Sequence, residues 1–212
     1  MNLNELKVEK IEKKVCEELI NKYHYLGKQG IAFRSGHNFG LYYGDTLIGV
    51  AVFHTVSVPE TVQGCFGLAR NEQQGIWELG RLAIHPDYNG KNYTSWFLAR
   101  AIKQLRKATD VRAIISYADT DYHCGYIYQA TNFKYYGLTA KKKDFWRKEP
   151  DGTYVKQSRG KTLGIEGEWR DRARKHRYMM VFDKKLKTKW QEEPYPKANN
   201  QESWGSQPFL AI

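Results

Sequence analysis

A strand, a short turn and a helix follow one another between residues 76 and 107, and this unit constrains the fold more than any other part of the chain. Residues 76–84 (IWELGRLAI) are mostly apolar and end at His85-Pro86, where the proline restricts the backbone before it. Residues 94–107 place their apolar side chains at helical spacing. Residues 111–117 (VRAIISY) form a second apolar run, as expected in the middle of a sheet. Strands alternating with a helix predict an α/β domain.

Hydrophobic periodicity predicts further elements on both sides of this unit. We expect a helix over residues 5–23 and two strands over residues 38–43 and 46–55, joined at Gly44-Asp45, a strong hairpin signal. A short helix over residues 123–130 and a strand through Tyr135-Tyr136 complete the order. This order favours a single α/β domain that spans residues 1–190.

The basic residues of the chain gather in one segment. The whole chain carries 34 Lys and Arg against 23 Asp and Glu, and residues 141–189 alone hold 17 against 7, interleaved with Trp and Tyr. Such a pattern suits a surface that follows a phosphate backbone, although a basic β-extension whose aromatics pack on the core explains it equally well. We expect residues 141–189 to form a basic C-terminal extension that contacts DNA. The candidate DNA-binding residues are Lys141, Lys142, Lys143, Arg147, Lys175 and Arg177.

The two ends of the chain and its cysteines limit the class of protein. Residues 191–212 are predicted to form an extended C-terminal arm that lies on the domain or on a partner. The N-terminus carries charges where a signal peptide needs apolar residues, and no apolar run approaches the roughly 20 residues that span a bilayer. We therefore expect a cytoplasmic protein with no membrane partner, either monomeric or dimeric. Cys16, Cys65 and Cys124 fit neither a disulfide framework nor a zinc site.

Residues 78–102 (ELGRLAIHPDYNGKNYTSWFLARAI) resemble the cofactor motif of the GNAT acyltransferases, in which a strand, a proline, a glycine-rich turn and a helix follow one another. The resemblance implies a mixed central sheet flanked by helices. Backbone N–H groups of such a turn and of the helix N-terminus bind the pyrophosphate of coenzyme A. Asn89, Asn92 and Thr94 depart from the usual Arg or Gln and two glycines, which predicts weak or atypical binding of acetyl-CoA or a related acyl donor. The positions assigned to the cofactor are Leu82, Ile84, Asn89, Gly90, Lys91, Asn92, Thr94 and Ser95.

Residues 116–137 (SYADTDYHCGYIYQATNFKYYG) resemble a more specific group, the Mom family of GNAT-like phage proteins that carbamoylmethylate adenine N6 in DNA. The segments YHYLG (23–27) and KHRYMMVF (175–182) also resemble parts of that family. The resemblance implies an enzyme that acts on double-stranded DNA and protects phage DNA from host restriction.

The same resemblance implies a set of site residues. Asp119 is the expected catalytic aspartate, as a base toward the adenine amine or as a metal ligand, although it could simply cap the following helix. His24 is the implied ligand of an iron-type metal that it shares with Asp119, although a lone histidine is more often structural. Tyr128 is the expected acid that protonates a leaving group. The catalytic candidates are Asp119, Tyr128, Tyr25, Arg81, Ser116 and His123.

Alternation along residues 76–84 gives Arg81 a predicted position. It places Trp77, Leu79, Arg81 and Ala83 on one face, and Glu78, Gly80, Leu82 and Ile84 on the other. An arginine among apolar neighbours must pair with a carboxylate, such as Glu78, or meet an anion. Glu78 is also a base candidate of the wider superfamily, and Tyr25, Tyr128 and Trp77 are expected to stack on a flipped adenine.

Two other functions remain open at this point. An N-acetyltransferase that acts on a small molecule or peptide would bind coenzyme A well. A non-catalytic, basic nucleic-acid-binding protein would keep the charge of residues 141–189 but tolerate the loss of Asp119 and Tyr128. The fold alone does not choose between them, because this superfamily hosts many chemistries.

Overall fold

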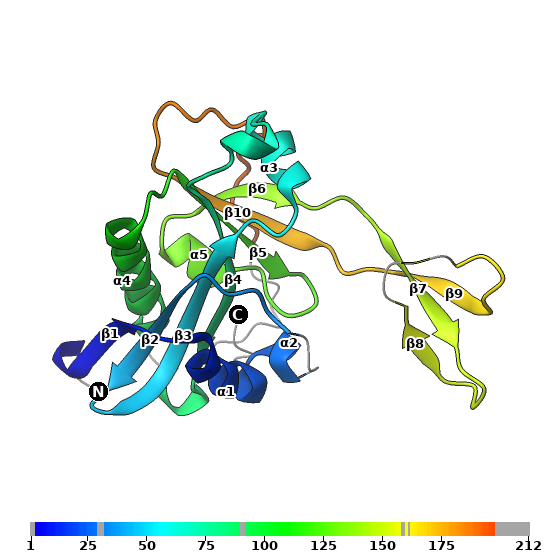
Figure 1. Cartoon of the computed structure of the whole chain (residues 1–212), viewed down its shortest axis with the longest axis horizontal. Coiled ribbons are helices and arrows are strands. Elements are labelled where there is room, and N and C mark those ends of the chain that lie inside the picture. The colour runs from blue at the N-terminus through cyan, green and yellow to red at the C-terminus, as the bar shows by residue number, and fades with distance from the viewer. Residues whose placement is uncertain (1–2, 29–31, 90–91, 158–159, 161, 198–212) are drawn as a thin grey trace.

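A seven-stranded mixed sheet forms the centre of the computed structural model, which describes residues 3–28, 32–89, 92–157, 160 and 162–197 (Figure 1). The strand order is β1-β2-β3-β4-β5-β10-β6, and β4 with β5 is its parallel pair. This mixed sheet confirms the predicted α/β fold. The strands are β1 (Leu6–Lys10), β2 (His37–Tyr43), β3 (Thr46–Thr55), β4 (Ile76–Ile84), β5 (Ala113–Asp119), β6 (Lys134–Leu138) and β10 (Lys175–Val181).

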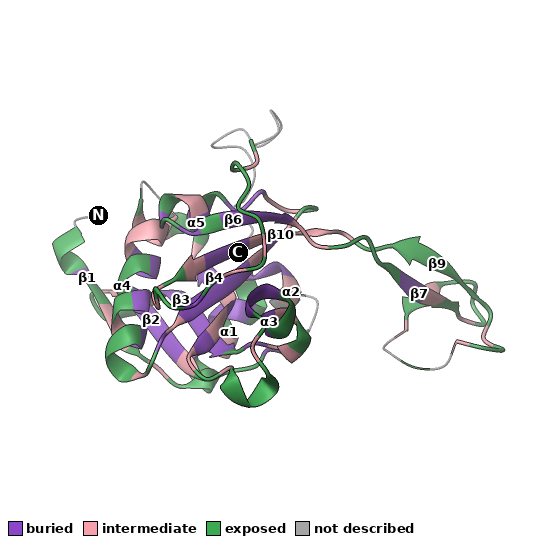
Figure 2. Ribbon diagram, turned by 90° about the horizontal axis from the view of Figure 1, so that it is seen from above, coloured by how far each residue is buried: buried purple, intermediate pink, exposed green. Residues whose placement is uncertain are grey.

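Helices cover both faces of the sheet because alternate strand residues face opposite sides. Ala51 and Phe53 of β3 join the core under the long helix α4, whereas Val50 and Val52 pack with α1 on the other face. Figure 2 shows the buried residues concentrated in the central strands. None of the helices in the described ranges is long and apolar enough to cross a membrane. The helices are α1 (Lys13–Tyr23), α2 (Tyr25–Lys28), α3 (Pro59–Phe66), α4 (Tyr93–Ala108) and α5 (Tyr126–Ala130), with 3-10 turns at Leu3–Glu5, Arg70–Glu72 and Pro86–Tyr88.

The N-terminal segment differs from its predicted structure. Residues 5–23 are not one helix, because β1 occupies Leu6–Lys10 and α1 begins only at Lys13. β1 pairs with β2 in register, from Leu6 opposite Tyr43 to Lys10 opposite Phe39. The hydrogen bonds of this edge strand override a local helical pattern.

The parallel pair β4 and β5 separates partway along its length. Their pairing runs from Ile76 opposite Ala113 to Leu79 opposite Ser116, yet β4 continues to Ile84. At the same point β4 bulges against β3, because Phe53 faces Leu79 and Val52 faces Arg81, so that Gly80 is the extra residue. A Cβ on Gly80 would lie 2.1 Å from Nε2 of His54, which explains why the bulge carries a glycine.

The bulge corrects the predicted faces of β4. One extra residue reverses the alternation, so Leu79 and Leu82 both enter the core under α4, while Ala83 packs with α1. Arg81 therefore shares the face of Glu78 and Ala83 rather than that of Leu79. Strict period-two alternation is wrong at this position because a bulge adds a residue to one strand only.

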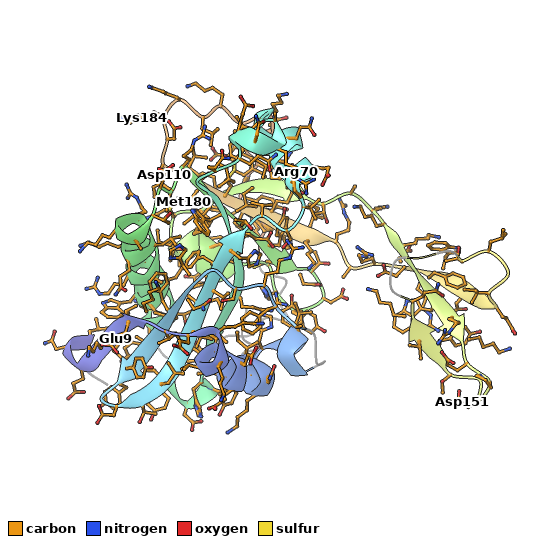
Figure 3. All side chains as sticks on the ribbon, in the orientation of Figure 1. Glu9, Arg70, Asp110, Asp151, Met180 and Lys184 are labelled. Carbon is orange, nitrogen blue, oxygen red and sulfur yellow. The ribbon has the colours of Figure 1, made fainter. Side chains whose placement is uncertain are left out.

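The basic segment 141–189 divides into an insertion and a core strand. Strands β7 (Lys143–Lys148), β8 (Tyr154–Lys156) and β9 (Gly167–Asp171) form a separate sheet of order β8-β7-β9 that projects from the body between β6 and β10 (Figure 1). We call β7–β9 the arm, and residues 139–142 and 172–175, which join it to the body, the stem. Asp151, labelled in Figure 3, lies beyond β7 at a tip of the arm. β10 belongs to the central sheet, where Tyr178 and Met179 are fully buried. The arm is thus an insertion within the domain rather than an extension after it.

The chain after β10 returns along β6. Glu193 pairs with Tyr135, the Tyr195 hydroxyl donates to the Phe133 carbonyl at 2.8 Å, and Lys134 forms an ion pair with Glu192 at 2.9 Å. Residues 191–197, the described part of the C-terminal segment that was predicted to be extended, therefore lie on the domain. Residues 198–212 lie outside the described ranges.

Candidate active site

A small pocket, partly open to solvent, lies where β4 and β5 separate. It is the kind of opening in which ligands of α/β sheets bind, beyond the point where neighbouring strands part. Four residues predicted for catalysis or metal binding meet there, namely His24, Tyr25, Arg81 and Tyr128. The other residues that line it are Leu26, Glu78, Leu79, Gly80, Leu82, Tyr117 and Lys175.

Tyr128 contributes a buried hydroxyl to this pocket. Its side chain is 2% exposed and packs between Phe133 and Tyr178, with ring centroids 5.5 and 5.1 Å away. The hydroxyl is hydrogen-bonded to Ser116 and lies 3.4 Å from the carbonyl of Tyr117. Burial raises the pKa of Tyr128, so the phenol stays protonated and can act as an acid. Tyr128 cannot offer a ring face to a base, which corrects that part of its predicted role.

Ser116 supports Tyr128 rather than reaching the pocket. Its side chain is fully buried, and its hydroxyl donates to the Leu79 carbonyl at 2.9 Å, at the last paired residues of β4 and β5. Ser116 therefore fixes both the separation point of the strands and the Tyr128 hydroxyl. It is a positioning residue.

Arg81 presents a positive charge to the pocket. One terminal nitrogen donates to the Gly80 carbonyl at 2.7 Å, and the buried Nε has no hydrogen-bond partner within the described part of the chain. Burial lowers the pKa of Arg81, while the nearby Tyr25 and Glu78 raise it by a smaller amount. Glu78 accepts a hydrogen bond from the Ser57 backbone at 2.9 Å, so one of its oxygens is already engaged. An arginine with an unused donor can bind an oxygen of a ligand.

Three aromatic rings form a column beside the pocket. Tyr25 stacks on His24 at 4.7 Å and contacts Tyr122 at 4.2 Å between ring centroids. Burial and, to a smaller extent, the nearby negative charge of Asp119 raise the pKa of Tyr25 to about 12. Tyr25 is therefore an uncharged phenol at neutral pH. Tyr122 is half-buried and was not among the predicted site residues. Its position in the loop after β5, three residues beyond Asp119, is the signal that could have identified it.

Asp119 ends β5 opposite Lys175 of β10. Its carboxylate accepts a hydrogen bond from the Asp121 N–H at 3.1 Å, and its carbonyl accepts from Tyr122 and His123 at 3.0 Å. The carboxylate thus holds the turn that carries Tyr122 and also acts electrostatically on Tyr25. Asp119 has both the predicted place near the site and a structural role in the turn.

His24 and Asp119 do not fit an iron-type metal site. His24 is buried, and its Nδ1 accepts a hydrogen bond from the Leu26 N–H at 3.1 Å. Across the described residues, no group of three or more His, Cys, Asp or Glu side chains could hold a metal ion. A non-haem iron centre of the common type needs two histidines and a carboxylate.

His123 lies away from the pocket lining. Its buried Nδ1 has no hydrogen-bond partner in the described structure. Burial lowers its pKa to about 4, assisted by the charge of His176, so the ring is neutral at pH 7. A neutral, partly buried ring that does not line the pocket indicates a structural position rather than the predicted catalytic one.

The predicted cofactor region lies at the start of α4. Asn92 has φ +64°, so it adopts the left-handed conformation that the usual glycine would favour and that asparagine tolerates best among other residues. The Thr94 hydroxyl donates to Asn89 at 3.1 Å, and Ser95 donates to the Asn92 carbonyl at 3.0 Å. Gly90 and Lys91 lie outside the described residues. Leu82 lines the pocket, and the Ile84 side chain lies in the core.

The predicted DNA-binding residues fall into different surroundings. Lys143 and Arg147 are paired with carboxylates on the arm, and the Arg177 guanidinium lies 4.4 Å from the Trp190 ring. Lys141 and Lys142 are exposed on the stem, and Lys175 lines the pocket. Trp77 lies away from the pocket lining; it contacts His37, and its Nε1 donates to the Asp110 carbonyl, so its expected stacking role is not supported.

Comparison with known proteins places the chain in context. A model of the Mom protein family matches residues 5–197, while no curated protein matches the sequence. An IAA acetyltransferase from Bacillus cereus aligns with a TM-score of 0.50 and 13% identity, over 84% of this chain and 99% of its own. A Salmonella typhimurium protein solved with its cofactor acetyl-CoA aligns with a TM-score of 0.50 and 12% identity, over 85% and 96%. The fold is therefore GNAT-like.

Proposed function

Because this chain belongs to the Mom protein family, we propose that it is a transferase that adds a carbamoylmethyl-type group to N6 of adenine in DNA. The observation that carries the proposal is the pocket at the β4–β5 separation, where Tyr25, Arg81 and Tyr128 meet beside Asp119. The pocket offers a phenol acid, a free guanidinium donor and a nearby carboxylate. These are the groups that a transfer to an amine requires.

Asp119 and Tyr128 have complementary proton roles in this proposal. Adenine N6 is a weak nucleophile because its lone pair is delocalised into the ring, so its proton must be accepted as the new bond forms. The carboxylate of Asp119 is the base, and the protonated Tyr128 hydroxyl supplies a proton to the leaving group. Ser116 keeps that hydroxyl in place.

Arg81 has the role of binding an oxygen of the transferred group. Its Nε has no partner among the described residues and its guanidinium lines the pocket. A cation held in a partly buried site stabilises developing negative charge more strongly than it would in water.

The fold offers a place for an acyl-CoA-type donor. In the described chain, β4 has no strand partner on its β5 side beyond Leu79, which leaves extended backbone beside the pocket, and the sixteen-residue helix α4 starts next to it. Leu82, Asn89, Asn92, Thr94 and Ser95 would contact such a donor, which would supply an activated carbon. A carbamoylmethyl group contains nitrogen, so acetyl transfer alone cannot produce it, and the donor or a second step must provide that atom.

A base inside a duplex must leave the stack before it can enter this pocket. Flipping a base costs a few kcal/mol, which stacking on aromatic side chains offsets. Tyr25 is buried between the rings of His24 and Tyr122, so it has no free face for a base. The half-buried Tyr122 at the end of this column replaces Trp77, Tyr128 and Tyr25 as the candidate for this role.

Nucleoside mass spectrometry tests the proposal. DNA from cells that express the chain should contain a deoxyadenosine heavier by a carbamoylmethyl group, which is absent from cells with an empty vector. Intact, soluble protein with an unmodified nucleoside profile would contradict it. An acetylated small molecule or peptide in the same cells would instead favour an N-acetyltransferase.

A further inference from the structure

The cations on the arm strands, all within the described residues, already have carboxylate partners. The strands β7, β8 and β9 are exposed to solvent on most positions, so these pairs sit at the surface apart from the buried Asp144 carboxylate (Figure 2). Replacing such a carboxylate with a phosphate brings little gain, because one ion pair is exchanged for another. The pairs are Arg147–Glu149, Lys148–Glu166, Lys156–Asp144 and Arg170–Glu168, with N···O distances of 2.5–2.7 Å.

The cations of the stem differ in this respect. Lys141, Lys142, Arg174 and Lys175 form no ion pair with any residue that the structure describes. Arg174 donates to the carbonyls of Thr139 and Leu138 at 2.7 and 3.5 Å, which orients the guanidinium but leaves its charge uncompensated. The remaining stem cation, Arg172, is paired with Asp144.

The stem also lies next to the pocket. Backbone hydrogen bonds join its two segments. The Thr139 N–H donates to the Lys175 carbonyl at 2.8 Å, and the Arg172 N–H donates to the Lys142 carbonyl at 2.9 Å. Thr120, the residue after Asp119, donates to the Arg174 carbonyl through its N–H and its hydroxyl, at 3.1 and 2.9 Å. Lys175 itself lines the pocket. The uncompensated charge is therefore fixed to the same turn as Asp119.

We propose that the stem, and not the arm, binds the DNA backbone beside the target adenine, with Lys141, Lys142, Arg174 and Lys175 neutralising phosphates. This inference rests on the proposed function. The three backbone steps from Thr139 to Lys142 span about 10 Å when extended. Successive phosphates of one strand advance by about 3.4 Å along the DNA axis, so the stem covers about three nucleotides. Each unpaired cation that meets a phosphate releases counterions, which drives binding.

Two double variants with the same change of charge separate stem from arm. Lys141→Ala with Lys142→Ala removes two unpaired cations, and Arg147→Ala with Lys148→Ala removes two adjacent paired cations on β7. The affinity of each full-length protein for a duplex oligonucleotide is measured between 50 and 200 mM salt. Loss of two phosphate contacts makes the negative slope of log affinity against log salt shallower by about 1.8. The affinity of such a variant should therefore fall about 12-fold less than that of the wild type between 50 and 200 mM salt. Circular dichroism checks that both variants are folded.

The stem variant should show this shallower slope, and the arm variant should keep the slope of the wild type. Equal effects of both variants, or an unchanged stem variant, would overturn the inference. The nucleoside profile separates this outcome from failure of the proposed function. If adenine is modified but DNA binding does not depend on the stem, only the proposed role of the stem is wrong. If binding depends on the stem but no modified adenine forms, the proposed chemistry is wrong and the role of the stem in DNA binding stands.

Discussion

Two buried tyrosines pack against each other, yet only one of them lines the pocket. Tyr128 and Tyr178 have ring centroids 5.1 Å apart, and Tyr178 donates to the Cys124 carbonyl and accepts from Gln129. Both hydroxyls are hydrogen-bonded in the core, but only Tyr128 is placed by the proposed function beside a leaving group. The pair therefore separates a chemical role from a packing role.

We predict that Tyr128→Phe and Tyr178→Phe have similar effects on stability but different effects on modification. Each change removes one buried hydrogen-bonding hydroxyl and costs about 1 kcal/mol of unfolding free energy. Loss of the acid in Tyr128→Phe lowers the rate of modification by about 100-fold, and Tyr178→Phe leaves it nearly unchanged. Urea unfolding and nucleoside analysis measure the two effects. Equal loss of modification in both variants would assign Tyr128 to packing alone.

His123 predicts a dependence of stability on pH. Its folded pKa of about 4 lies below the value near 6.5 expected in the unfolded chain, so the unfolded state binds more protons between these values. The contribution of His123 is complete above pH 6.5 and is lost as the pH falls toward 4. We expect the loss of this contribution to lower the unfolding free energy by about 2 kcal/mol between pH 7.5 and pH 5.

Urea unfolding at both pH values, on the wild type and His123→Phe, checks this effect. Phenylalanine keeps a ring in the enclosed site but does not titrate, so the variant should lose less stability on acidification. The same loss in both proteins would place the titrating group elsewhere.

The sequence predicted several site residues but not all of them. His24, Tyr25, Arg81 and Tyr128 line one pocket although they come from three distant parts of the chain, and family motifs located them. Tyr122 lies within the 116–137 segment but was not predicted as a site residue, because its contact with Tyr25 depends on α2 approaching the loop after β5. Such a contact is set by tertiary packing, which spacing along the chain does not report.

At the scale of elements, the proposed binding of an acyl donor depends on the turn before α4. Asn92 holds a left-handed conformation in this turn, and Asn132 holds one, at φ +65°, between α5 and β6. Glycine relieves the same backbone strain at either position. Only the turn at Asn92 lies at the helix N-terminus where a pyrophosphate would bind.

We predict that acetyl-CoA binds weakly to the wild type and more tightly to Asn92→Gly, because the backbone can then approach the ligand closely. Asn132→Gly is the matched control and should leave binding unchanged. Isothermal calorimetry with acetyl-CoA measures all three proteins. Tight binding by the wild type, with no gain from Asn92→Gly, would favour an ordinary acetyltransferase.

Element prediction succeeded where local pattern and tertiary pairing agree. The hairpin β2–β3, strand β4 and helix α4 lie close to their predicted ranges, and Gly44 has the positive φ of +56° that its turn requires. β1 was predicted as helix because its alternative, pairing with β2, involves residues 29 to 37 positions away. The bulge at Gly80 was missed because it is defined by the pairing of β4 with β3. The sequence of β4 alone shows an ordinary alternation.

At the scale of the whole molecule, composition located the basic segment but not its shape. The charge between residues 141 and 189 includes an arm with internal ion pairs, a stem with unpaired cations and the core strand β10. Composition adds these charges together, whereas the structure shows which of them are already neutralised. The predicted α/β sheet is correct because its order follows from local elements and from general rules of connection.

The central claim is that the pocket beside Asp119 modifies adenine, and a comparison of two aspartates tests it most directly. Asp119→Asn removes the charge but keeps an oxygen that can accept from Asp121 N–H, so the turn and the DNA affinity are preserved. Asp121→Asn removes a neighbouring, exposed charge as the control. Mass spectrometry of nucleosides from cells expressing each soluble variant should find carbamoylmethylated deoxyadenosine with Asp121→Asn and none with Asp119→Asn. Modification at the wild-type level in Asp119→Asn would contradict the claim.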